Sequence, residues 1–161
     1  MGLVHHVMEQ TTVTRATFQA FINELVTILA PRVPNDKEVF IIFDGARPHL
    51  NVVVPPEFED KFHVVMLPPY CPFFNPVEQA HSCLKNAIKQ HLALPHIQAE
   101  ILDIQNMRAA AGLNQQQWRA NVLLRIGNNA LHQITQQKCA NWCARIHRYI
   151  PASLNREIIQ D

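Results

Sequence analysis

The stretch from Pro68 to Pro76 restricts the fold most, because it holds four prolines in nine residues. Proline removes a backbone donor and fixes φ, so this stretch excludes both a helix and a central strand. The six residues before it, FHVVML, predict a short strand over 62–67. The residues after it repeat apolar side chains every three or four positions and predict a helix over 77–92, with Pro76 suited to its first turn.

The residues upstream of this connector predict two further strands and one helix. Residues 2–8 are rich in Val and His and indicate a strand. Thr14 is a candidate N-cap for an amphipathic helix that ends before Pro31. The run EVFIIF over 38–43 is typical of a central strand buried on both faces, and it stops at the turn signal Asp44-Gly45.

The residues downstream predict only helices. One helix is expected over 97–111, stopped by Gly112. Asn114 is a candidate cap for a long helix that continues towards Tyr149, with 127–129 as a point where it could break in two. The fold class predicted from the whole pattern is α/β over residues 1–92, followed by an all-helical region over 93–161.

Composition narrows the class of protein. The chain has 161 residues, of which 48% are hydrophobic and 17% charged, so a packed core is expected rather than global disorder. No apolar run reaches the roughly 20 residues that span a bilayer, and no secretory signal opens the chain. The four cysteines are therefore expected to be reduced thiols, in a protein that is nuclear or otherwise intracellular and not secreted.

The charge is divided unevenly along the chain. Residues 1–80 hold five basic and nine acidic side chains, a balance of −4, whereas residues 81–161 hold nine and four, a balance of +5. A polyanion would prefer the second half. The alternative is that these Lys and Arg residues are the solvated faces of ordinary helices.

Two carboxylates stand where chemistry is expected. Asp44 follows the most apolar predicted strand, and ligand-binding groups in open α/β sheets gather beyond such strand ends. Glu78 opens the helix that follows the rigid connector. Together they could supply hard oxygen ligands to Mg²⁺ or Mn²⁺. Taken singly, Asp44 could be a plain turn residue, and Glu78 could simply favour the helix macrodipole.

The segments FIIFDGARPH and VVMLPPYCPFFNPVEQAHSCLK resemble the mariner superfamily of DNA transposases, DDE-type endonucleases with a ribonuclease-H-like fold. Asp44 matches the second catalytic Asp of that pattern and Glu78 its third acidic residue, with 33 residues between them. The connector matches at Pro68, Pro69, Tyr70, Pro72, Asn75 and Pro76, and the helix at Leu84-Lys85. Gly45, the pair Phe73-Phe74 and His81 depart from the usual residues.

The resemblance implies an activity and a site. Relatives cleave DNA and transfer strands in transposition and integration, using carboxylates that hold two divalent metals. It therefore implies that Asp44 and Glu78 are catalytic metal ligands, that Mg²⁺ or Mn²⁺ is the cofactor, and that DNA is the partner. The resemblance is compatible with either a monomer or a homo-oligomer, and no membrane partner is expected.

The resemblance also implies that one catalytic residue is missing. The family's first Asp ends the first strand of the fold, yet no Asp precedes Asp36, which lies in a Pro-Asn-Asp-Lys turn. We therefore expect a ribonuclease-H-like fold that lacks its first strands, truncated at the N-terminus. Two functions follow: a DDE endonuclease domain that is inactive as this fragment, or a non-catalytic remnant that binds nucleic acid or protein.

Three further residues are candidates for contacting nucleic acid. Lys85 and Lys89 follow Glu78 by seven and eleven residues, on nearly the same helix face, where they could meet phosphates. His49 matches a recurrent family position near the active site. The alternatives are a solvated helix face and an ordinary loop histidine.

The remaining metal-binding patterns are weak. Cys139, Cys143 and His147 recur every four residues, but three ligands along two helical turns do not close around one tetrahedral zinc. Buried thiols beside Trp142 are the preferred interpretation. His5 and His6 would point to opposite faces of a strand.

Overall fold

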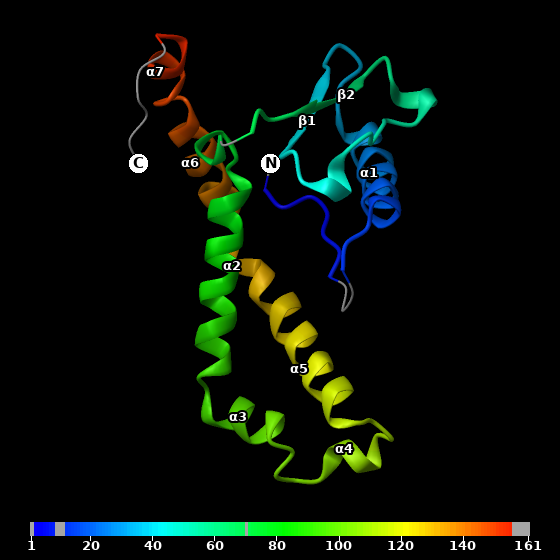
Figure 1. Cartoon of the computed structure of the whole chain (residues 1–161), viewed down its shortest axis with the longest axis vertical. Helices are drawn as coiled ribbons and strands as arrows, with labels where there is room; N and C mark the ends of the chain where they lie inside the picture. The colour runs from blue at the N-terminus through cyan, green and yellow to red at the C-terminus, as the bar shows by residue number, and fades with distance from the viewer. Residues whose placement is uncertain (1, 9–11, 70, 156–161) are drawn as a thin grey trace.

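A computed structural model describes residues 2–8, 12–69 and 71–155 of the chain. A small sheet with one helix lies at one end, and the remaining helices form an elongated arm (Figure 1). In chain order the helices and strands are α1 (Arg15–Leu29), β1 (Val39–Phe43), β2 (Phe62–Met66), α2 (Val77–Leu92), α3 (Pro95–Ile101), α4 (Met107–Ala110), α5 (Gln115–Ala130), α6 (Gln136–Ile146) and α7 (Ile150–Leu154).

The two strands pair in parallel, with Val39 opposite Phe62 and Phe43 opposite Met66. Parallel pairing requires a crossover, because the chain must return to the start of the sheet before the second strand begins. Residues 44–61 make this crossover and include short 3₁₀ turns at Arg47–His49 and Pro56–Phe58. Both strands were predicted at these positions, and both are confirmed.

Helix α1 covers one face of the sheet. Thr14 caps it as predicted, in a reciprocal capping box with Thr17. The buried side chains of this first core come from α1, the crossover and β2: Ile22, Val26, Leu29, Val52, Val54 and Phe62.

The expectation that β1 is buried on both faces is wrong. Its burial alternates, and the side chains of Phe40 and Ile42 are 58% and 54% exposed. Val39, Ile41 and Phe43 pack against the α1 core instead. Alternation is the period-2 consequence of a strand with a helix on only one side.

The predicted strand over residues 2–8 is also absent, since these residues have no strand pairing. They run as an extended segment between α1 and α5. The His5 ring stacks on Phe21 at 5.0 Å, and His6 Nε2 lies 3.4 Å from Asn128 Oδ1. A Cβ on Gly127 would lie 2.9 Å from Met8 Sδ, so glycine permits the close approach. Residues 2–8 have the composition of a strand, but in the structure they pack against helices.

The arm is built around α2 and α5, which lie side by side (Figure 1). Ile97, Val122 and Ile126 form a second core between α3 and α5. No helix among the described residues is long and apolar enough to cross a membrane.

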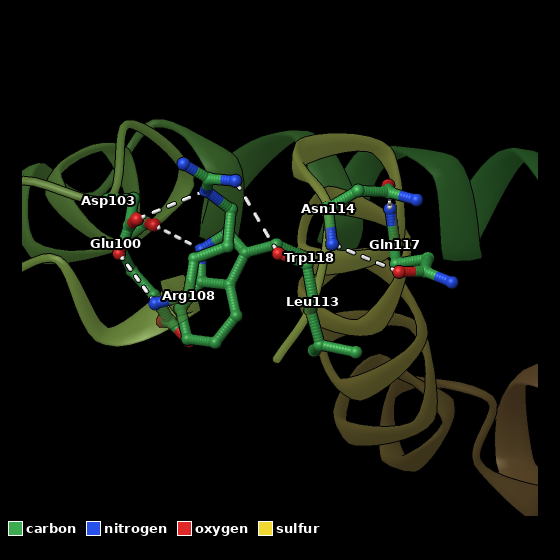
Figure 2. Close-up of polar contacts among 7 residues, drawn as sticks. All are labelled: Glu100, Asp103, Arg108, Leu113, Asn114, Gln117 and Trp118. Carbon is green, nitrogen blue, oxygen red and sulfur yellow. Dashed lines mark hydrogen bonds and ion pairs between the residues drawn. The ribbon is translucent and has the colours of Figure 1, made fainter. Parts of the chain in front are cut away.

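The single helix predicted over 97–111 is two helices, α3 and α4. Asp103 and Asn106 adopt left-handed backbone conformations between them. The Asp103 carboxylate then accepts a hydrogen bond from the Arg108 backbone, and the Arg108 guanidinium pairs with it at 3.3 Å (Figure 2). The Asp103 side chain thus satisfies an amide in the first turn of α4, and the second helix starts there.

The long helix predicted from Asn114 to Tyr149 is also divided. Asn114 caps α5 in a capping box with Gln117, as expected (Figure 2). The break falls after Ala130 rather than at 127–129, because Thr135 accepts a hydrogen bond from the Lys138 N–H and starts α6 as a new N-cap. The thiols of α6 are less buried than expected: Cys139 is half-buried and Cys143 exposed.

Candidate functional site

Asp44 occupies the carboxyl end of β1. The ladder continues one bond past the strand, from the Leu67 N–H to the Phe43 oxygen at 2.8 Å, so the Asp44 backbone starts from a fixed position. Its Oδ1 accepts a hydrogen bond from the Ala46 N–H at 3.1 Å and lies 2.7 Å from His49 Nδ1. The side chain is 49% exposed. One carboxylate oxygen is thus held by the turn, and the group stays open to solvent.

His49 is fixed against the same turn. Its ring stacks on Phe18 with centroids 4.0 Å apart and meets the edge of Phe43 at 5.6 Å. Only 21% of its side chain is exposed, and Nδ1 also lies 3.1 Å from the main-chain oxygen of Asp44. The structure therefore gives His49 a role in orienting the Asp44 carboxylate.

Glu78 lies in the first turn of α2, and Asn75 fixes where that helix begins. Asn75 is only 6% exposed; its side-chain oxygen accepts from the Val77 N–H at 3.3 Å, and its main-chain oxygen from the Glu78 N–H at 3.2 Å. Pro76 then supplies a helical φ at the boundary. Glu78 is exposed, and its carboxylate forms no ion pair with another residue in the described part of the chain. Tyr70, which shares this motif, lies outside the described residues.

A cleft of about 890 Å³ lies between α1, α2 and α5. His49, the contact of Asp44, lines it on one side. His81 lines it on the other and stands three residues after Glu78, on the same face of α2. The rest of the lining is mostly apolar, from α1, α5, Val7, Met8 and Val13. A contact of Asp44 and a helix neighbour of Glu78 thus line one cleft, while the two carboxylates are not among its lining residues.

Sequence reasoning missed this cleft and the place of His81 in it. The helical spacing from Glu78 was a usable signal, because residues three apart share a helix face. The apolar side chains of α1 and α5 that line the cleft carry no chemical pattern of their own.

Lys85 and Lys89 are exposed on α2, two and three turns beyond Glu78. Neither forms an ion pair with another described residue. They lie on nearly the same face of α2 as Glu78 and add positive charge to it. A phosphate backbone lying along α2 could therefore contact both lysines.

The type of ligand that Asp44 and Glu78 offer suits a hard divalent cation. Carboxylate oxygen is the ligand that Mg²⁺ and Mn²⁺ prefer, and the carboxylates of Asp44 and Glu78 are both open to solvent. The number of ligands is too small for a complete site. Across residues 2–8, 12–69 and 71–155, no three His, Cys, Asp or Glu side chains form a group that could hold a metal ion.

Comparison with known proteins identifies a family. A family model described as DDE superfamily endonuclease matches residues 2–99, which include both carboxylates, the cleft histidines and the two lysines of α2. No curated protein and no solved structure matches the chain.

Replacing Asn75 with Ala tests how Glu78 is positioned. Asn75→Ala removes the acceptor for the Val77 N–H and leaves a gap at a buried position. We expect the free energy of unfolding in urea to fall by about 1–2 kcal/mol. Asn86→Ala, an exposed change in the middle of the same helix, should not lower it, because Ala is the better helix former. An equal decrease for both substitutions would show that Asn75 is not the anchor of α2.

Proposed function

The chain belongs to the DDE superfamily endonuclease family, and on that premise we propose that it is a transposase-derived nuclease domain that acts on DNA. The observation that carries the proposal is the family match over residues 2–99, which contain Asp44 at the carboxyl end of β1 and Glu78 in the first turn of α2. Metal-dependent cleavage of a phosphodiester requires carboxylate ligands for the metal ions. Asp44, at the end of a parallel strand, and Glu78, at the start of the helix after the next strand, are such carboxylates.

In this proposal Asp44 and Glu78 are the second and third acidic residues of the family's catalytic set and would hold Mg²⁺ or Mn²⁺. The bound ions supply activation of the attacking oxygen and stabilisation of the leaving oxygen of a phosphodiester. His49 and the Ala46 N–H hold one oxygen of Asp44, and the other oxygen would bind the ion. Lys85 and Lys89 bind the phosphate backbone beside the cleft.

We place the chain within the mariner superfamily, with a ribonuclease-H-like fold. The support for this is the connector 68–76, with its prolines and its Asn75-Pro76 helix start, and the parallel β1–β2 pair. The exposed face of β1 is consistent with a sheet that has further partners in relatives. The order of α1, β1, crossover, β2 and α2 agrees with the second part of that fold.

The number of ligands decides between activity and binding alone. Two carboxylates leave a metal site underliganded, and Mg²⁺ demands near-octahedral geometry. In the part of the chain that the structure describes, no third ligand joins them. This observation favours the second candidate function, DNA binding without cleavage, for the 161-residue chain tested by itself.

A nicking assay on supercoiled plasmid tests this assignment. The 161-residue chain should produce no nicks above background with Mg²⁺, and any residual nicking should come first with Mn²⁺, which is less exacting in geometry. The Asp44→Ala and Glu78→Ala variants serve as controls, with electrophoresis of plasmid forms as the measurement.

Two results would correct the assignment differently. Clear cleavage that both substitutions abolish would keep the site and show that two carboxylates of this chain suffice. Cleavage insensitive to both would remove Asp44 and Glu78 from the chemistry altogether.

DNA binding should be weak, independent of sequence and strongly dependent on salt. Lys85→Glu with Lys89→Glu should lower the affinity for a short duplex and reduce the slope of log affinity against log salt by about 2, one for each phosphate that a lysine no longer neutralises. Fluorescence anisotropy across a salt series measures both quantities.

Lys37→Glu is the matched control. Lys37 is exposed, but it precedes β1, at the opposite end of that strand from Asp44. Its reversal should leave the salt slope unchanged. Lys37→Glu reverses one charge and the α2 variant reverses two. If the Lys37 variant reduces the salt slope by half as much as the α2 variant, the binding follows net charge and does not involve a surface along α2.

A further inference from the structure

A lysine and a cysteine meet where α2 crosses α6. Lys138 Nζ lies 3.4 Å from Cys83 Sγ, and both side chains are partly buried. The main-chain oxygen of Gln133 accepts from Lys138 Nζ at 2.9 Å and from the Cys83 thiol at 3.6 Å. One carbonyl thus holds the nitrogen and the sulfur against each other, between two elements separated by 55 positions in the chain.

A thiol in contact with an amine can undergo a reaction that a single thiol cannot. Sulfur and an amine nitrogen are both nucleophiles that a peroxide can oxidise, and a sulfenic acid condenses with a neighbouring nucleophile when one is in contact. Among the contacts of the described residues, this is the one that joins a lysine nitrogen to a cysteine sulfur. The flexible four-carbon stem of lysine permits the small approach that a bond requires.

We propose that Cys83 and Lys138 form a reversible nitrogen–oxygen–sulfur cross-link when the protein meets hydrogen peroxide. The first peroxide transfers an oxygen to Cys83 Sγ, giving the sulfenic acid and one water. A second peroxide transfers an oxygen to the deprotonated Lys138 amine, giving the hydroxylamine and another water.

The bond then forms by condensation. The hydroxylamine oxygen attacks the Cys83 sulfur, and the sulfenic hydroxyl leaves with a proton as a third water. Sulfur and nitrogen each lose two electrons, and each peroxide gains two. The chain gains one oxygen and loses two hydrogens, a mass change different from that of a disulfide or a sulfinic acid.

The cross-link would tie α2 to α6 a little more than one helical turn beyond Glu78 (Figure 1). Closing so long a loop restricts the unfolded chain more than the folded one, so the oxidised form should melt at a higher temperature. The inference does not depend on the proposed nuclease activity, because it concerns covalent structure alone.

Mass spectrometry of a chain with a single cysteine tests the proposal. In the variant Cys71→Ser, Cys139→Ser, Cys143→Ser, no intramolecular disulfide can form. Treatment with hydrogen peroxide should give the gain of one oxygen with loss of two hydrogens, and digestion should yield one peptide pair joining Cys83 to Lys138. Dithiothreitol should restore the original mass and the lower melting temperature. The unsubstituted chain, mapped in parallel, should show the same pair.

Lys138→Arg is the control that keeps the positive charge and removes the amine. In that variant Cys83 should oxidise to sulfinic or sulfonic acid with no linked peptide pair. Cross-linking that persists there, or oxidation of Cys83 without a linked pair while Lys138 is present, overturns the proposal.

Discussion

The parallel pairing of β1 with β2 is the constraint on which the site depends. Because both strands run in the same direction, their carboxyl ends meet at one edge of the sheet, and Asp44 and the connector to α2 both leave from there. Asn75 fixes where the helix after the connector begins. The strand pairing therefore brings Asp44 and the chain that leads to Glu78 to one sheet edge, although 33 residues separate the two carboxylates.

The elements with strong local signals were predictable from sequence, and those that depend on partners were not. Thr14, the prolines around 68–76 and the periodicity of α2 act within a few residues, so their elements are found as predicted. Residues 2–8 have the composition of a strand, but a strand exists only by pairing, and in this structure they pack on helices. Phe40 and Ile42 look buried in a sequence, because an apolar run does not reveal whether a second layer covers it.

The candidate site likewise has parts that the sequence predicts and parts that it does not. Its carboxylates were recognisable because a strand end, a proline-rich connector and a helix start form a pattern along the chain. Its cleft was not, since much of the lining comes from α1, α2, α5, Val7, Met8 and Val13, which only the tertiary packing brings together. His49 was expected near DNA, and the structure gives it a contact with Asp44 that no spacing rule would have indicated.

The central claim is that Asp44 and Glu78 serve one metal site, and paramagnetic NMR tests it most directly. Titrating the ¹⁵N-labelled chain with Mn²⁺ should broaden the amide signals of Gly45 and Gln79 together, at the same metal concentration. Asp44→Asn should suppress the broadening at both positions. Broadening at only one of them, or suppression at Gly45 with Gln79 unaffected, would show that the two carboxylates belong to separate sites.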